Sequence, residues 1–267
     1  KGMSSAALAE RLAREGDVEY AVPDRRKRIV AAPNDQYYTT APMLAAGQWY
    51  LRQNDASFPA AINAEGAWTT TTGNPSVVVA VIDTGVAPVK YLDSADAVVN
   101  GPDLSLDRQL GLPTAVDAYG HGTHLAGIIA GRDAGVAPGS RIVNLKVGAA
   151  DGAVDVSQVI AAIDWVVTHR ADPGFNIRVI NLAYGTDGTQ SYVDSPLTHA
   201  VESAWRAGIV VVVAAGNSGG ALAMPATDPF VLTVGAADVN DPLQAADDVV
   251  APYSAVGTTA RGVDLLA

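Results

Sequence analysis

The sequence predicts an α/β domain in which a mostly parallel sheet carries helices on both faces. Two observations lead to this prediction. Short runs of apolar, mainly β-branched residues recur along the chain, and amphipathic stretches with short links lie between them. Runs that are apolar at nearly every position are typical of strands buried on both faces, as in parallel sheets, and strand–helix–strand order implies right-handed crossovers. The expected strands are residues 77–82, 142–147, 179–182, 209–214 and 231–234.

Two amphipathic segments between these runs carry helix signals at their ends. Residues 156–169 have an apolar stripe at helical spacing, with Asp155 or Ser157 available as N-cap. Residues 196–207 begin with proline, which favours the first helical position, and Gly208 follows directly. Both segments are therefore expected to be crossover helices.

The first 33 residues differ from the rest of the chain. Residues 5–15 form a short helical pattern, and residues 18–22 are strand-like. Residues 25–42 are charged and then rich in Pro, Asn and Asp, which indicates an exposed linker. We therefore expect two parts, residues 1–33 and residues 34–267.

Charge is distributed unevenly over these two parts. The whole chain has a formal net charge of −11. Residues 1–33 hold 7 Lys or Arg and 5 Asp or Glu, giving +2, whereas residues 34–267 hold 10 and 23, giving −13. Nucleic acids and anionic membranes bind basic surfaces, so neither is expected as a partner.

Hydropathy and cysteine content exclude further classes. No apolar run reaches the roughly 18 residues that a membrane span requires, and Lys1 is not followed by the apolar segment of a signal peptide. The chain has no Cys, which excludes disulfides, thiolate-bound zinc and thiol catalysis. The cysteine count does not identify a cellular compartment.

Asp83 is the first candidate for chemistry. It ends the apolar run 77–82 and is followed by Thr84 and Gly85, so its carboxylate is expected at the carboxyl edge of a buried strand, where sites collect in parallel sheets. A turn residue is the plain alternative. An aspartic protease is a second alternative, but it needs a second such motif and an all-β chain.

His121 and His124 lie in Gly120-His121-Gly122-Thr123-His124, which leads into the apolar residues 125–130. A His at the start of a buried helix has an exposed ring edge on a rigid base. Helical zinc pairs are normally spaced by four with a Glu between them, which does not fit this spacing of three. The flanking glycines permit another segment to approach closely, so both a catalytic and a structural role are open.

Asn217 follows the apolar run 209–214 in a Gly-rich segment. A carboxamide there is able to donate a hydrogen bond to a developing oxyanion. The alternative is a turn residue, which Gly neighbours favour.

Three motifs occur in a fixed order: Asp83-Thr84-Gly85 at a strand end, Gly120-His121-Gly122-Thr123-His124 at a helix start, and Ala214-Ala215-Gly216-Asn217-Ser218-Gly219 after a later strand. In this order they closely resemble the subtilisin-like serine proteases, the subtilases of peptidase family S8. The resemblance runs from about residue 34 to the last residue and implies the subtilisin-like three-layer fold. Further matches lie in Gln48-Trp49-Tyr50-Leu51, Gly135-Val136-Ala137-Pro138, Asn181-Leu182-Ala183-Tyr184-Gly185, Pro225, Val234-Gly235-Ala236, and from Tyr253-Ser254 to Val263-Asp264.

This resemblance implies roles for individual residues. Asp83 would orient the imidazole of His121, which would act as general base and then general acid. His124 would be structural. Asn217 would donate its side-chain amide to the oxyanion.

Six further residues are implied as substrate-binding: Ala183, Tyr184, Gly185, Ala214, Ala215 and Gly216. The first three would pair with an extended substrate backbone as a β-strand. Together with the others they would line the pocket for the residue before the scissile bond. The family more often has Ser where Ala183 stands, which matters little if the contacts are made by the backbone.

The resemblance also implies partners. Residues 5–23 resemble the last helix and strand of the inhibitory propeptide of these proteases, so the chain's own propeptide is an expected partner beside protein or peptide substrates. No cofactor is required for the chemistry. Structural calcium is common in the family, but residues 131–135 are too short for the usual calcium loop, so no metal-binding residue is assigned.

The family's nucleophile stands in a Gly-Thr-Ser motif, and no Ser of this sequence can be assigned to it. The resemblance therefore implies a serine endopeptidase whose nucleophilic Ser lies downstream of this chain, so that residues 1–267 alone are expected to be inactive. The alternative is a non-catalytic, subtilase-like module that binds peptides. A secreted or extracytoplasmic zymogen is the expected context.

Overall fold

The computed structural model describes residues 3, 5–12, 14–16, 38, 47–94, 96–113, 116–186, 191–239 and 248–267. The chain divides into two compact units, Lys1–Ala31 and Ala32–Ala267. The first unit contains helix α1, Ser5–Leu12, where the sequence predicts one. The strand expected at residues 18–22 lies outside the described residues, as does almost all of the linker. The propeptide assignment therefore stays a prediction.

A parallel sheet forms the centre of the second unit. Within the described residues it has seven strands in the order β2-β3-β1-β4-β5-β6-β9, and every neighbouring pair is parallel. A separate antiparallel pair consists of β7, Ala237–Asp238, and β8, Val249–Val250. The strands of the large sheet are β1 Val78–Asp83, β2 Val98–Asp103, β3 Arg141–Lys146, β4 Ile177–Leu182, β5 Val210–Ala214, β6 Leu232–Gly235 and β9 Leu265–Leu266.

The helices begin and end close to their sequence signals. The amide of Asp155 donates to Oε1 of Gln158 over 2.9 Å, so Asp155 rather than Ser157 is the N-cap of α5. Gly208, just beyond α6, has a φ of +80°, which a side chain would disfavour. The helices of this unit are α2 Ala64–Trp68, α3 Leu106–Gln109, α4 His121–Ala130, α5 Val156–His169 and α6 Pro196–Arg206, with 3₁₀ turns η1 Trp49–Leu51 and η2 Tyr192–Asp194.

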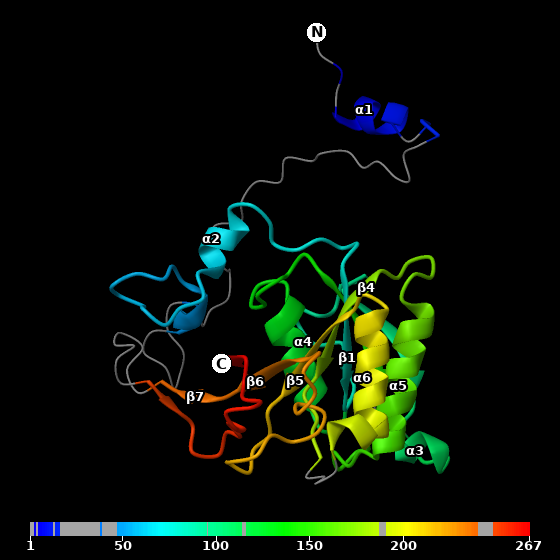
Figure 1. Ribbon diagram of the computed structural model, residues 1–267. Coiled ribbons are helices and arrows are strands. Elements are labelled where there is room, and N and C mark those ends of the chain that lie inside the picture. The colour runs from blue at the N-terminus through cyan, green and yellow to red at the C-terminus, as the bar shows by residue number, and fades with distance from the viewer. Residues whose placement is uncertain are drawn as a thin grey trace. The chain divides into compact units, whose positions relative to one another are not determined.

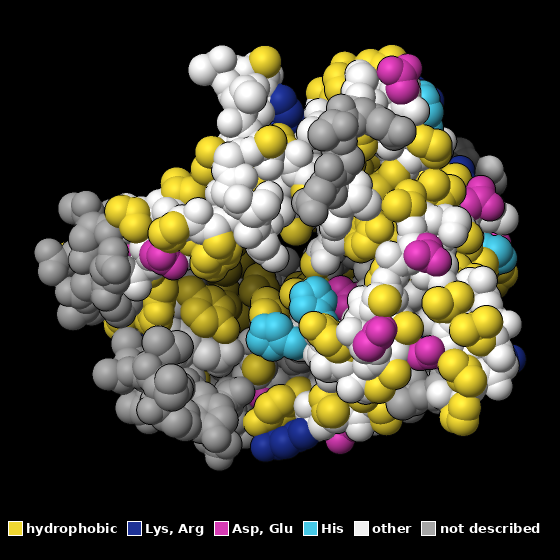
Figure 2. Space-filling model, turned by 90° about the horizontal axis from the view of Figure 1, so that it is seen from below, with side chains coloured by type: hydrophobic (Ala, Val, Ile, Leu, Met, Phe, Trp, Pro, Cys, Tyr) yellow, Lys and Arg dark blue, Asp and Glu magenta, His cyan; other side chains and the backbone are white. Residues whose placement is uncertain are grey.

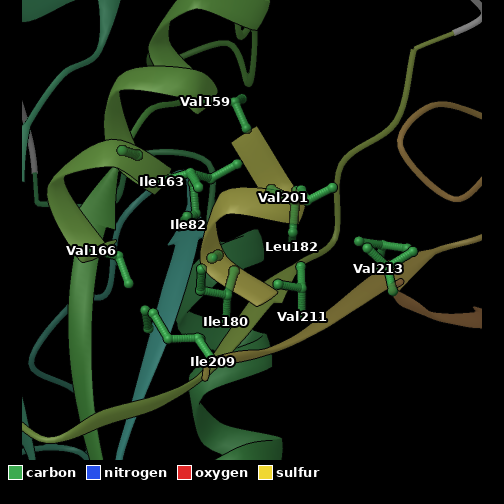
Figure 3. Close-up of a cluster of buried hydrophobic side chains, with 14 of the residues drawn as sticks. Ile82, Val159, Ile163, Val166, Ile180, Leu182, Val201, Ile209, Val211 and Val213 are labelled. Carbon is green, nitrogen blue, oxygen red and sulfur yellow. The ribbon is translucent and has the colours of Figure 1, made fainter. Parts of the chain in front are cut away.

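Helices cover the two faces of the sheet, as Figure 1 shows. Alternate residues of β1 point to opposite sides, because the side-chain period of a strand is two. Ile82 and its alternates pack with α5 and α6 in the larger core, whereas Val81 packs with α4. Figure 3 shows the larger core, with side chains of α5 and α6 against β4 and β5. The expected three-layer α/β fold is confirmed.

Among the described residues, helices cover only one face of the sheet at β5 and β6. On β5, Val211 and Val213 are buried against the α6 side. On the opposite face Val210 is 37% exposed and Leu232 of β6 is 41% exposed. The half-buried Val212 and Val234 lie on the same face. These four residues are called the open apolar face below. Parallel sheets are normally buried on both faces, so this face departs from the expected pattern.

Among the described residues, the helices are too short or too polar to span a membrane.

Candidate active site

Asp83 is the last residue of β1, so its carboxylate lies at the carboxyl edge of the sheet, as expected. β1 lies between β3 and β4, and the Asp83 side chain is only 4% exposed. The amide of Thr84 donates to its Oδ1 over 2.7 Å. A buried carboxylate needs further partners to replace its lost hydration.

His121, the first residue of α4, is a further partner of this carboxylate. Its Nδ1 lies 2.8 Å from Oδ1 and 2.9 Å from Oδ2 of Asp83. An ionised carboxylate only accepts hydrogen bonds, so in the neutral imidazole paired with it Nδ1 would carry the proton and Nε2 would keep its lone pair. The His121 side chain is 43% exposed. This geometry would suit a general base whose ring orientation is set by a carboxylate.

Two glycines permit the approach of Asp83 and His121. A Cβ on Gly122 would lie 2.2 Å from the carbonyl oxygen of Gly85 and 3.0 Å from Cβ of Asp83. Gly85 has a φ of +118°, and a Cβ there would lie 1.8 Å from the carbonyl oxygen of Val116. The loop after β1 therefore packs directly on the first turn of α4. Of the two glycines that flank His121, Gly122 shows the close approach that the sequence predicts, whereas a Cβ on Gly120 would meet nothing within 4 Å.

Asp117 joins the same two segments, and sequence reasoning missed it. Its Oδ1 accepts from Thr84 Oγ1 (2.9 Å) and the Gly120 amide (2.8 Å). Its Oδ2 accepts from the amide (3.0 Å) and the hydroxyl of Thr123. Burial by itself would raise the pKa of Asp117, but these hydrogen bonds outweigh it and lower the pKa below its ordinary value. An Asp shortly before a helix start is the signal that could have identified it.

Lys146 is a second missed residue near the site. It pairs in register with Asp83 across β1 and β3 and is 4% exposed. Its Nζ donates to the carbonyl oxygens of Thr84 (2.6 Å) and Gly148 (2.8 Å). A Lys inside a run expected to be buried on both faces needs such hydrogen-bond acceptors. Its position in that mostly apolar run is the sequence signal that could have identified it.

The residues assigned to substrate binding lie in two loops at the same edge of the sheet. Ala183, Tyr184 and Gly185 follow β4, whose last residue pairs with Val213 of β5. Ala214 ends β5, and Ala215 and Gly216 follow it. The fold therefore brings the two predicted groups onto neighbouring strands.

Ala223 packs between these loops and was not singled out from the sequence. A Cβ on Gly185 would lie 2.7 Å from Cβ of Ala223, and a Cβ on Gly216 would lie 3.0 Å from it. Tyr184 is half-buried. Burial, with Asp155 nearby, raises the pKa of Tyr184, so its hydroxyl stays neutral near pH 7.

Asn217 lies at the same edge of the sheet, three residues past the end of β5. Its side chain is exposed, and β4 separates β5 from β1 in the sheet. Asn217 is thus accessible to a ligand bound across the ends of these strands. Its oxyanion role stays a prediction.

His124 is exposed on α4, so it has no place in the core. With Tyr50, Tyr91 and Ile128 it lines a surface cavity of about 340 Å³. In Figure 2 two His side chains lie side by side at the rim of a hollow whose floor is hydrophobic. The structural role implied for His124 therefore does not arise from core packing within the described residues.

In the stretch considered for calcium, two carboxylates pair with an arginine. The guanidinium of Arg132 lies 3.5 Å from Asp93 Oδ1 and 3.8 Å from Asp133 Oδ2, so a positive charge already faces these carboxylates. In the part of the chain that the structure describes, no group of three or more His, Cys, Asp or Glu side chains is placed to hold a metal ion.

Residues 74–267 match the family model described as the subtilase family, peptidase S8. The chain belongs to the subtilase family. This match covers well over half of the sequence and includes all three motifs. The membership inferred from their order is therefore confirmed.

Individual subtilases agree with this membership. The chain is 35% identical to the serine protease AprX of Bacillus subtilis (strain 168) over 199 residues, 70% of this chain and 44% of that protein. It is 34% identical to the thermophilic serine proteinase of Bacillus sp. (strain AK1) over 258 residues, 92% of this chain and 57% of that protein. The chain therefore spans about half the length of these curated relatives.

A solved subtilase structure supports the fold. A cold-adapted subtilisin-like serine proteinase superposes with a TM-score of 0.57 at 32% identity, over 74% of this chain and 64% of the other. The subtilisin-like three-layer fold expected from the motifs is therefore confirmed.

Proposed function

We propose that this subtilase chain provides the Asp and His of an Asp-His-Ser triad in an endopeptidase that cleaves proteins or peptides through an acyl-enzyme. The contact between Asp83 and His121 Nδ1, which leaves an exposed imidazole edge, is the observation that supports it most. A peptide-binding module has no use for a carboxylate-oriented base. This function is therefore favoured over the non-catalytic alternative.

We place the nucleophilic Ser of the triad on a segment downstream of residue 267. Among the described residues, His121 hydrogen-bonds through its ring to Asp83 and to no Ser. The open apolar face of β5 and β6 would suit that segment, because a parallel sheet requires cover on both faces. Residues 1–267 alone would then be inactive and poorly soluble.

Roles for the remaining site residues follow from this proposal. Asn217 would donate to the oxyanion. Ala183, Tyr184 and Gly185 would pair with the substrate backbone, and Ala214, Ala215 and Gly216 would form the opposite wall of the pocket. Ala223, which contacts both loops, would form its base.

A fluorophosphonate, which labels activated serines, tests the proposed triad. The chain is produced alone and together with the downstream segment. We expect labelling only when both parts are present, and its loss in His121→Ala. His199→Ala, which alters an exposed His of α6, is the matched control and should label normally. Labelling of the isolated chain would place the nucleophile within it and refute the proposal.

We also propose that residues 1–33 contain the tail of an inhibitory propeptide, and that the protein acts outside the cytoplasm. Residues 1–33 have a net charge of +2 and residues 34–267 a net charge of −13. Electrostatic attraction between parts of opposite charge weakens with salt. An added peptide of residues 1–33 should inhibit the protease less well at about 0.5 M than at about 0.05 M salt. Equal inhibition constants would contradict the electrostatic part of this proposal.

A further inference from the structure

The carboxylate of Asp117 holds together the two segments that carry Asp83 and His121. One of its oxygens accepts from the hydroxyl of Thr84, the residue directly after Asp83. It also accepts from the amides of Gly120 and Thr123, which lie on either side of His121. None of these hydrogen bonds goes to the side chain of Asp83 or His121. It fixes the backbone on both sides of their contact.

Two hydroxyl groups close this arrangement into a network. Thr84 Oγ1, which donates to Asp117, accepts from the amide of Gly122 over 3.0 Å. Thr123 Oγ1, which also donates to Asp117, accepts from the amide of Ala87 over 2.9 Å. The loop after β1 and the first turn of α4 are thus joined at several points around one anion.

The backbone around His121 needs such a restraint. His121 stands between Gly120, with a φ of +93°, and Gly122. Glycines have wide conformational freedom, so the contacts around them, rather than the glycines themselves, fix the direction of the imidazole. An anion that accepts hydrogen bonds at the N-terminus of a helix is also favoured by the helix dipole.

We propose that Asp117 is a positioning residue for the Asp83–His121 pair, which keeps the imidazole against Asp83 while Nε2 faces the substrate. This inference rests on the proposed function, because it concerns the base of that reaction. The lowered pKa of Asp117 agrees with it, since the carboxylate is ionised throughout the neutral range. Its four hydrogen bonds all come from neutral N–H and O–H groups.

Asp117→Asn in the complete protein, including the Ser-bearing segment, tests the proposal. The variant keeps the side-chain size but replaces one accepting oxygen by an NH₂ group that faces other donors. We expect kcat to fall about 10- to 100-fold, because small misplacements of a catalytic base are costly, while KM changes by less than about 3-fold. Asp172→Asn, at an exposed Asp after α5, is the matched control and should keep both constants.

The proton on His121 Nδ1 gives a second readout that needs no activity. In the wild type its hydrogen bond to Asp83 should give a strongly downfield NMR signal. In Asp117→Asn we expect this signal to broaden or disappear, although Asp83 and His121 are unchanged. A stable Asp117→Asn protein with normal kcat and an unchanged signal would overturn the proposal.

Two further comparisons apply if Asp117→Asn does not fold or if the wild type is not labelled. If Asp117→Asn does not fold, Thr123→Val removes one hydroxyl contact to Asp117, and Thr123→Ser retains it. The Val variant should lose kcat several-fold and the Ser variant should not, so equal activity of the two would count against the network. If the wild type shows no fluorophosphonate labelling, the proposed function fails, whereas the NMR comparison still decides whether Asp117 positions His121.

Discussion

Asp83 and Asp117 are carboxylates in the same small region, yet their neighbours give them different tasks. Asp83 faces the ring of His121 and is able to support a developing positive charge on it. Asp117 faces backbone amides and hydroxyls and holds the loops in place. In the proposed function, the different surroundings of the two carboxylates would give Asp83 an electrostatic role and Asp117 a positioning role.

The lowered pKa of Asp117 makes stability depend on pH. Its stabilising contribution is fully present above its ordinary pKa of 3.8 and is lost as the pH falls through the lower pKa of the folded state. We expect Asp117→Asn to be less stable than the wild type at pH 7, with a smaller difference near pH 3. Urea denaturation at several pH values measures this. A difference that is constant with pH would contradict it.

Asn217 should matter mainly after charge develops on the substrate. We expect Asn217→Ala in the complete enzyme to lower kcat about 10²- to 10³-fold with little change in KM, because the amide donor is needed in the transition state. Steady-state kinetics on a peptide substrate measures both constants. Ser218→Ala, at the exposed neighbouring residue, is the control. Normal turnover in Asn217→Ala would return Asn217 to the role of a turn residue.

At the scale of elements, helix α4 shows why one glycine is required and another is not. A Cβ on Gly122 would collide with the loop after β1, whereas a Cβ on Gly127 meets nothing within 4 Å. Both residues belong to the same helix. Their substitution therefore separates a packing requirement from helix propensity.

We expect Gly122→Ala to lower the free energy of unfolding by about 1–3 kcal/mol through overpacking, and to disrupt the Asp83–His121 contact. Gly127→Ala should instead raise it by about 0.5–1 kcal/mol, because alanine favours the helical state. Denaturant unfolding of both variants in the complete protein measures these values. Similar effects of the two substitutions would contradict the packing described for Gly122.

The elements themselves were predictable to different degrees. The strands β1, β3, β4, β5 and β6 were expected within a few residues, because each lies in a run that is mostly apolar and rich in β-branched residues. The edge strand β2 was missed, since Gly101 and Pro102 interrupt its pattern. β9 has only two residues, which is too short to give a periodic signal.

At the scale of the whole molecule, the apolar face of β5 and β6 has no helix packed on it among the described residues. Leu232 and Val210 are exposed there although the other face of the same strands is buried. If the Ser-bearing segment covers this face, its binding would complete both the catalytic triad and the hydrophobic core. Activity and stability should then be gained together.

Leu232→Lys examines this coupling. We expect the isolated chain to tolerate the charge, because Leu232 is 41% exposed. Association with the downstream segment should weaken about 100-fold or more, because assembly would bury an unpaired ammonium group. Titration of one part with the other, followed by fluorophosphonate labelling, measures the affinity. Val249→Lys, on the separate β7–β8 pair, should assemble normally, and equal effects of both substitutions would refute this location for the segment.

The sequence by itself determined the local features of this subtilase. Apolar runs, helix caps and the order of the three motifs lie within short stretches of chain, so they can be recognised without knowing what packs against them. Asp83, His121 and Asn217 were found in this way. Only the tertiary structure decided the contact between Asp83 and His121 and the hydrogen bonds of Asp117. Both depend on how the loop after β1 packs against α4. Asp83 and His121 are 38 positions apart in the sequence, and no local periodicity encodes a contact between such distant residues.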